Sequence, residues 1–211
     1  MHLLLSSALA QWATFEPPSS APSLAPWGEH QSFEAGFGLV TGLGGDGTTV
    51  TDHDFPGPGF LDAFVDLQLS AAFQLRPMTD LVFTSYLGTG SILGAGLGAR
   101  FWVARNELGA LGLQLDMGLL YIRASLPMVV TIDHISFYCA PTVQAALGAQ
   151  LRTPFGISVQ PPTLPQLVFS LESGIALTVQ DSLPPDWDEG TKYFGAITVS
   201  YRGDRADLKK G

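Results

Sequence analysis

The sequence predicts an all-β chain that closes into an antiparallel, up-and-down transmembrane β-barrel. Three observations lead to this class: apolar side chains alternate with small or polar ones, the alternating runs are long, and few residues are charged. Charged residues make up 14% and hydrophobic residues 46% of the 211 positions, whereas an ordinary soluble domain carries roughly 25% charged residues. The 24 Gly and 15 Pro disfavour long helices, and the hydrophobicity excludes a disordered chain.

The alternation is clearest between Leu61 and Arg76. All eight positions on one face of this run are apolar, and six of the eight on the other face are polar. Comparable runs predict eight strands, at residues 33–43, 61–76, 81–88, 93–103, 111–121, 135–151, 167–179 and 193–202. Strands of globular proteins are about 5 to 6 residues long, and membrane-spanning strands need roughly 9 to 11. The length of these runs therefore favours a membrane.

A sheet in hydrocarbon has to close, because its edges would otherwise leave backbone groups without partners. We expect eight strands, and Met128 to Ile132 is a further short segment that leaves ten as the alternative count. An even number places both termini on the periplasmic side. The long outer connections are expected at residues 45–59, 125–133 and 181–190, and a long periplasmic connection at 153–164.

The polar face of each strand is expected to line a narrow lumen. Charges confined there must be paired or hydrated, so we expect a network of ion pairs and water that plugs the lumen. The inward charged residues are Glu34, Asp66, Arg100, Asp116, Arg152 and Glu172. Aromatic residues near the strand ends are expected to form outward interfacial girdles; these are Phe33, Trp102, Tyr121, Phe137, Tyr193 and Tyr201.

The ends of the chain differ in composition from its centre. We expect residues 1–10 to be the remnant of a signal peptide, because Leu3 to Leu5 form an apolar core before a small-x-small cleavage pattern. Residues 11–31, rich in Pro and Ser, are expected to be an extended linker. The barrel itself is expected at 32–202 and a charged tail at 203–211.

Over residues 32–202 the chain resembles the small outer-membrane β-barrels of the OmpA/OmpX type. The resemblance rests on the alternation, the strand number and the terminal strand Lys192 to Arg202, with an aromatic near its end at Tyr201. It implies a porin-like barrel in the outer membrane of a Gram-negative envelope, in contact with outer-membrane lipid. It also implies that the barrel-assembly machinery binds the terminal strand. The chain departs from this pattern because ten residues follow Tyr201.

One arrangement invites a catalytic interpretation. His134 and Ser136 are two residues apart, so on a strand both would share a face, and the parity of the run places that face inside. The spacing is similar to the His-x-Ser of the lipid A 3-O-deacylase family, which implies a base at His134 and a nucleophile at Ser136. That family continues with Asn and an acidic residue where this chain has Phe137 and Gly148. We therefore expect no catalytic residues and no enzyme.

The composition restricts partners and cofactors. A net charge of −9 argues against nucleic acid, because a phosphate backbone needs a basic surface. A single cysteine, Cys139, excludes a cysteine-based zinc site. Carboxylates cluster in the expected outer loops and could ligate Ca²⁺, but solvated loops are commoner, so no metal or cofactor is expected; they are Asp52, Asp54, Asp186, Asp188 and Glu189.

These observations favour a non-enzymatic outer-membrane barrel with a plugged polar lumen. Its expected role is structural, or one of surface interaction through the acidic outer loops, whose ligand is unknown. Three alternatives remain open: a small channel for ions or solutes, a lipid A-modifying enzyme, and a soluble ligand-binding barrel with its apolar face inside. A fourth interpretation applies to residues 81–99, whose lack of charge and glycines at 90, 94 and 98 would also suit a membrane helix.

Overall fold

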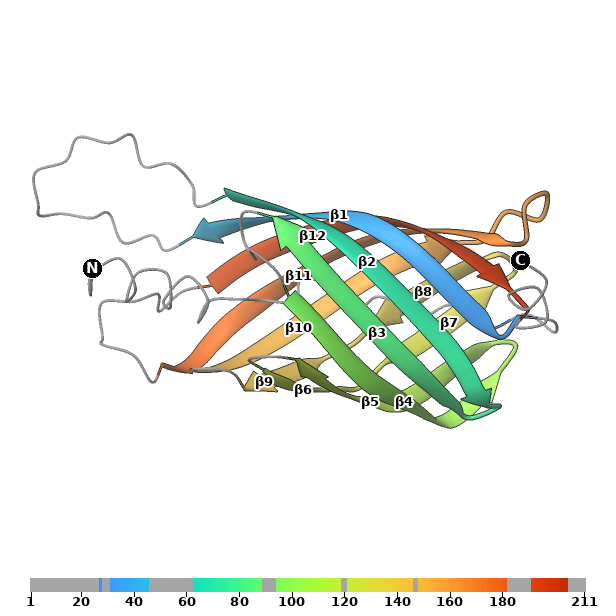
Figure 1. The fold of residues 1–211 in the computed structure, drawn as a ribbon, viewed down its shortest axis with the longest axis horizontal. Helices are drawn as coiled ribbons and strands as arrows, with labels where there is room; N and C mark the ends of the chain where they lie inside the picture. Colours follow the sequence, from blue (N-terminus) through green and yellow to red (C-terminus); the bar gives the residue numbers. More distant parts are fainter. Residues whose placement is uncertain are drawn as a thin grey trace, which may run out of the picture.

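The computed structural model describes residues 27, 31–45, 63–88, 94–118, 121–145, 148–181 and 191–204. Within these ranges the chain forms antiparallel strands that are tilted against the barrel axis and close into a barrel (Figure 1). In chain order the strands are β1 (Phe33–Gly45), β2 (Ala63–Arg76), β3 (Thr79–Gly88), β4 (Gly94–Asn106), β5 (Gly109–Gly118), β6 (Ile122–Ser125), β7 (Met128–Ile132), β8 (Ile135–Cys139), β9 (Thr142–Ala145), β10 (Gly148–Val159), β11 (Leu167–Asp181) and β12 (Thr191–Gly203).

The twelve strands occupy ten positions around the wall. β6 and β7 share one position, because both pair with β5 on one side and with β9 and β8 on the other. β8 and β9 likewise share the next position, between β6–β7 and β10. The pairing of β12 with β1 completes the ring. The all-β antiparallel barrel is therefore as expected, and its count is the alternative of ten rather than eight.

Residues 122–159 form the two wall positions that the expected count of eight did not include. The expected outer loop at 125–133 contains β7, and the expected strand at 135–151 is a hairpin that continues into the expected connection at 153–164. In this hairpin Ala145 pairs with Ala149 and Val143 with Leu151, so odd-numbered side chains lie on the outer face of both strands. Because the alternation passes through the turn unchanged, the pattern alone carries no sign of it.

Three prolines explain why two wall positions are divided. Gly112 pairs with Pro127, Leu126 with Pro141, and Ala140 with Pro154, and in each pair the first residue donates its N–H to the proline carbonyl at 2.9 to 3.0 Å. Proline has no N–H to return, so each pair makes one ladder bond where two are usual. The regular pairing is interrupted at these points, between β6 and β7 and between β8 and β9.

The two ends of the barrel differ in their connections. We name the end where β1 begins and β12 finishes the terminal end; it carries the turns at 77–78, 107–108 and 133–134 and the longer connection at 160–166. At the turn before β8, Asp133 has a φ of 53°, a left-handed conformation that Asp tolerates better than most residues. The segment 125–133 thus reaches the terminal end, and its turn is not an outer loop as expected.

The faces of the wall are sorted by polarity. Large apolar side chains are exposed on the outside, with Phe37 at 64% and Ile197 at 62%, whereas charged and hydroxyl side chains are buried inside. A soluble ligand-binding barrel has the opposite arrangement, so that alternative is wrong for this wall. Residues 81–88 and 94–99 lie in β3 and β4, which excludes the membrane-helix alternative for them. Across the part of the chain that the structure describes, no helix is long and apolar enough to cross a membrane.

Candidate functional site

The six expected lumen charges are all buried inside the wall. Strand alternation turns them inward on β1, β2, β4, β5, β10 and β11, and their exposed fractions are at most 4%; they are Glu34, Asp66, Arg100, Asp116, Arg152 and Glu172. Three of them, Glu34, Arg100 and Asp116, join a continuous polar network that runs inward from the terminal end. Of the other three, Arg152 packs its guanidinium against Phe194, with 4.8 Å between guanidinium carbon and ring centre.

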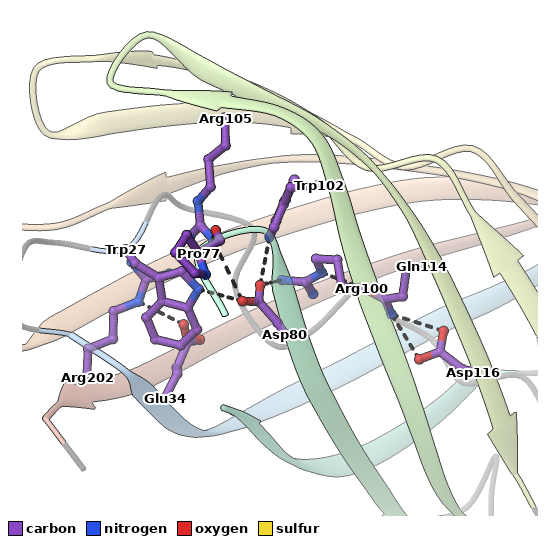
Figure 2. A network of polar contacts seen from close by, with 10 residues as sticks. All are labelled: Trp27, Glu34, Pro77, Asp80, Arg100, Trp102, Arg105, Gln114, Asp116 and Arg202. Carbon is purple, nitrogen blue, oxygen red and sulfur yellow. Dashed lines mark hydrogen bonds and ion pairs between the residues drawn. The ribbon is translucent and has the colours of Figure 1, made fainter. Parts of the chain in front are cut away.

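Asp80 of β3 is the centre of this network and is fully buried (Figure 2). Its Oδ2 accepts the indole N–H of Trp102 at 2.8 Å, and its Oδ1 accepts the indole N–H of Trp27 at 3.1 Å. The guanidinium groups of Arg100 and Arg105 lie 3.9 and 3.7 Å from the same carboxylate. Charge-assisted contacts on both oxygens compensate the cost of burying Asp80.

From Arg100 the network continues across the neighbouring strands. The Arg100 Nε donates to Gln114 Oε1 at 2.7 Å, and the Gln114 amide donates to both oxygens of Asp116 at 3.0 Å. Arg123 of β6 donates its Nε to Asp116 at 2.9 Å. Arg100 stands opposite Gln114, and Asp116 opposite Arg123, in the strand register. The network is therefore a consequence of which inward residues the register makes neighbours.

A second ion pair lies where the barrel closes. Arg202 of β12 donates its Nε to Glu34 of β1 at 2.8 Å, and both side chains are fully buried. Its guanidinium carbon also lies 4.9 Å from the centre of the Trp27 ring. Figure 2 shows Trp27 between this pair and Asp80.

The expected site residues included none of Asp80, Arg105, Arg123, Arg202 and Trp27. Asp80 falls in an expected turn because β3 begins two residues earlier than the pattern predicts, and Arg123 lies in a strand that is not expected at all. Arg202 lies on the inward parity of β12, as the alternation of this run indicates, but it was not counted among the expected lumen charges. Arg105 departs from the parity of β4, because the register shifts between Trp102 and Ala104. A parity count carried to the start of β3 would have placed Asp80 inside.

Three of the six aromatic residues that were expected to face outward do so. Phe137, Tyr193 and Tyr201 are exposed on the outer face. Trp102 and Tyr121 are buried in the lumen, which corrects their assignment: Trp102 bonds to Asp80, and Tyr121 lies between β5 and β6 instead of within the expected strand. Phe33 is also buried, because its ring covers the bare backbone of Gly203 on the neighbouring strand.

Inward aromatic rings rest against inward glycines. A Cβ on Gly118 would lie 2.1 Å from Cε1 of Tyr121, and a Cβ on Gly96 would lie 2.1 Å from the Tyr121 hydroxyl. Gly174 offers the same kind of space to Phe194, where a Cβ would come within 2.3 Å of the ring. The glycines therefore make room for large inward side chains inside a narrow wall.

The catalytic alternative finds no support in the geometry. His134 is exposed in the turn before β8 rather than directed inward as expected, since the strand starts only at the next residue. Ser136 is buried, and its Oγ lies 3.0 Å from the hydroxyl of Thr131. The two side chains thus do not share a face. The neighbouring backbone carbonyl of His134 accepts the N–H of Gln160 at 2.9 Å.

The acidic residues expected in outer loops, Asp52, Asp54, Asp186, Asp188 and Glu189, lie outside the described residues, as do residues 1–10 and nearly all of the expected linker. Among the residues that are described, no group of three or more His, Cys, Asp or Glu side chains is close enough to hold a metal ion. The arrangement that the structure does show is a set of buried inward charges, among which Asp80, Asp116 and Glu34 form ion pairs with arginines.

No protein-family model matches the chain, and no curated protein matches it either. Among solved structures it is similar to Ail, the attachment invasion locus protein of Yersinia pestis, at 11% identity and a TM-score of 0.35, covering 82% of this chain and 97% of Ail. It is also similar to the KdgM porin, solved in complex with disordered oligogalacturonate (10% identity, TM-score 0.41, 80% and 98% covered). A third is the translocator domain of the autotransporter NalP from Neisseria meningitidis (11%, 0.39, 95% and 96%).

Proposed function

We propose that the chain is an outer-membrane β-barrel protein whose lumen is plugged by its own side chains. The observation that carries this proposal is the inverted sorting of polarity: exposed Leu, Ile, Val and Phe on the outer face of the wall, and buried charges inside. So large an apolar surface in water would aggregate, whereas in a bilayer it faces acyl chains. A barrel also leaves no strand edge without a partner, as hydrocarbon requires.

The connections support an orientation. Three of the turns at the terminal end contain two residues, and short turns are typical of the periplasmic side of such barrels. The opposite end, with the longer gaps at 46–62 and 182–190, then faces outward and carries the acidic residues. The barrel-assembly machinery would bind the terminal strand, which is β12.

The plugged lumen is supported by the inward side chains. Arg100, Gln68 and Ser200 are each about as buried as a residue in the core of a soluble protein, at 1% exposed. Water can reach little of their surface, and the Arg100 charge is held by partners on neighbouring strands. Such a lumen stabilises the barrel and passes no solute in the state that the structure describes, in which Trp27 is docked. The role of the barrel in this state is a structural one, or surface interaction through the outer loops.

Refolding of the purified chain into phospholipid vesicles tests the barrel. We expect vesicle-bound protein to resist extraction at high pH and to migrate faster in gels before boiling than after it. In cells, fractionation should place it with the outer membrane. A chain that stays monomeric in water without detergent or lipid, and shows no change of migration on heating, would contradict the proposal.

The role of the acidic loops needs its own experiment. Neutralisation of Asp186, Asp188 and Glu189 to Asn, Asn and Gln should lower the binding of a Lys-rich peptide to cells that carry the protein. The same substitutions should leave heat-dependent migration unchanged, because the strands are untouched. Unchanged peptide binding would remove these loops as an interaction surface.

A further inference from the structure

The terminal end of the barrel holds an indole that does not come from the wall. Trp27 precedes β1 and reaches into the polar network, where its N–H donates to Asp80. Residues between it and β1 also contact this end of the barrel. The Gln31 amide donates to the carbonyl of Pro165 at 2.8 Å, and Ser32 exchanges backbone bonds with its neighbours, donating to Gly203 at 2.9 Å. Trp27, Gln31 and Ser32 thus lie at the terminal end of the lumen, which we name the mouth.

Trp27 and Trp102 make the same two kinds of contact with side chains of the wall. Each indole donates its N–H to one oxygen of Asp80. Each ring also lies beside guanidinium groups: Arg202 is 4.9 Å from the Trp27 ring centre, and Arg100 and Arg105 are 5.5 and 5.1 Å from that of Trp102. A carboxylate for the N–H and a cation for the ring face are the two groups that an indole binds best. The mouth therefore binds two indoles: that of Trp102, which belongs to the wall, and that of Trp27, which does not.

The second indole is held differently from the first. Trp102 belongs to β4, and its backbone N–H donates to the carbonyl of Met78, so it cannot leave without breaking the wall. Trp27 contributes to no strand. Its contacts with Asp80 and Arg202 are side-chain contacts that can break while every strand pairing stays intact. Its departure would bring water to Asp80, Arg202 and Glu34, which are all fully buried while it is in place.

We propose that Trp27 is a removable stopper: the mouth at the terminal end is an indole-binding site that the chain's own N-terminal segment fills, and withdrawal of Trp27 opens the lumen to small ions. The second half of the proposal rests on the proposed function, since conduction requires a barrel that spans a membrane. The first half concerns the docking of Trp27 alone. The two halves are tested by separate measurements.

Conduction is measured on single proteins in planar bilayers, for the wild type, Trp27→Ala and Trp27→Phe. We expect a silent wild type, step-like currents from Trp27→Ala, and a loss of most of these currents in Trp27→Phe, which keeps a ring for Arg202. A peptide with the sequence of residues 21–31 should block the Trp27→Ala currents from the terminal side only. The same peptide with alanine in place of Trp27 is the matched control and should not block. An inserted, heat-modifiable Trp27→Ala protein that is as silent as the wild type would overturn the stopper.

Docking is measured in detergent by fluorine NMR of protein labelled with 5-fluorotryptophan. The chain has four Trp, and the resonance that disappears in Trp27→Phe belongs to Trp27. Asp80→Asn should shift this resonance together with that of Trp102. The Trp12 and Trp187 resonances serve as internal controls and should stay in place. If Asp80→Asn left the chemical shift of Trp27 unchanged, the proposed indole-binding site would be wrong, regardless of the conduction measured in bilayers.

Discussion

Arg202 and Glu34 are 168 positions apart in the chain, and their side chains form a fully buried ion pair 2.8 Å long inside the lumen. They stand opposite each other in the pairing of β12 with β1, which is the pairing that closes the barrel. Removal of one partner leaves a buried charge without its counter-ion, and this typically costs roughly 3 to 5 kcal/mol.

We therefore expect Glu34→Gln and Arg202→Gln each to lower the free energy of unfolding by about that amount. The double variant should lose much less than the sum of the two, because no charge is left alone. Urea unfolding in lipid vesicles, followed by gel migration without boiling, gives the three values. Strictly additive losses would show that the two side chains do not act as a pair.

Leu115 and Leu108 provide a test of which surface faces lipid. Leu115 lies in the middle of β5 on the outer face, and Leu108 lies in the turn at 107–108; both are exposed, at 47% and 75%. Leu115→Arg should weaken assembly by roughly 2 to 4 kcal/mol, and Leu108→Arg by about 0 to 1, because the cost of a charge depends on its depth in the bilayer. Refolding yield in vesicles measures both. Equal yields would contradict the membrane position of β5.

Tyr121 allows a test of the glycine contacts in the lumen. Gly96 faces the hydroxyl end of this ring and Gly118 faces its carbon edge. Either Gly→Ala change should destabilise the barrel by about 1 to 3 kcal/mol through overpacking. Tyr121→Phe should restore much of the loss in Gly96→Ala, because it removes the oxygen that clashes, and little of the loss in Gly118→Ala. Thermal unfolding of the four variants distinguishes the two contacts, and equal rescue would argue against this packing.

The hydroxyl of Thr142 compensates for a missing ladder bond. Pro154 stands opposite Ala140 and has no N–H, and the Ala140 carbonyl accepts the Thr142 Oγ1–H at 2.7 Å instead. Thr142→Val should cost about 1 to 3 kcal/mol, the usual cost of a buried carbonyl left without a donor. In a Pro154→Ala background the same change should cost less, since the substituted residue has an N–H to donate. The cycle is measured by urea unfolding, and an equal cost in both backgrounds would refute the compensation.

The face assignments could be predicted from the sequence because strand geometry imposes a period of two on every residue of a strand. Glu34 and Glu172 are far apart in the chain, yet the same rule turns both inward, and the structure buries both. The number of strands could not be predicted in this way. Where β9 returns as β10, the register pairs Ala145 with Ala149, so odd-numbered side chains stay on the outer face and the alternation does not record the change of direction.

The polar network was predictable only as a set of inward charges. Its pairs depend on register, and register depends on turns and on prolines whose effect appears only when the strands are aligned. The position of Trp27 in the lumen could not be predicted from any sequence pattern, because a single side chain from a Pro-rich segment has no periodicity. Its partner Asp80 was lost for a related reason: it lies at a strand end, where boundaries from sequence are least certain.

The pairing of β1 with β12 also has a consequence for synthesis of the protein. β1 cannot pair with β12 until the last strand has been synthesised. Until then, a growing sheet of up to nine positions exposes two edges and a broad apolar surface. Contacts between such distant residues form slowly, and open edges invite other chains to add to them. A cell that makes this protein therefore needs a holding factor that shields the nascent sheet, and a message truncated before residue 191 should yield only aggregates or fragments for proteases.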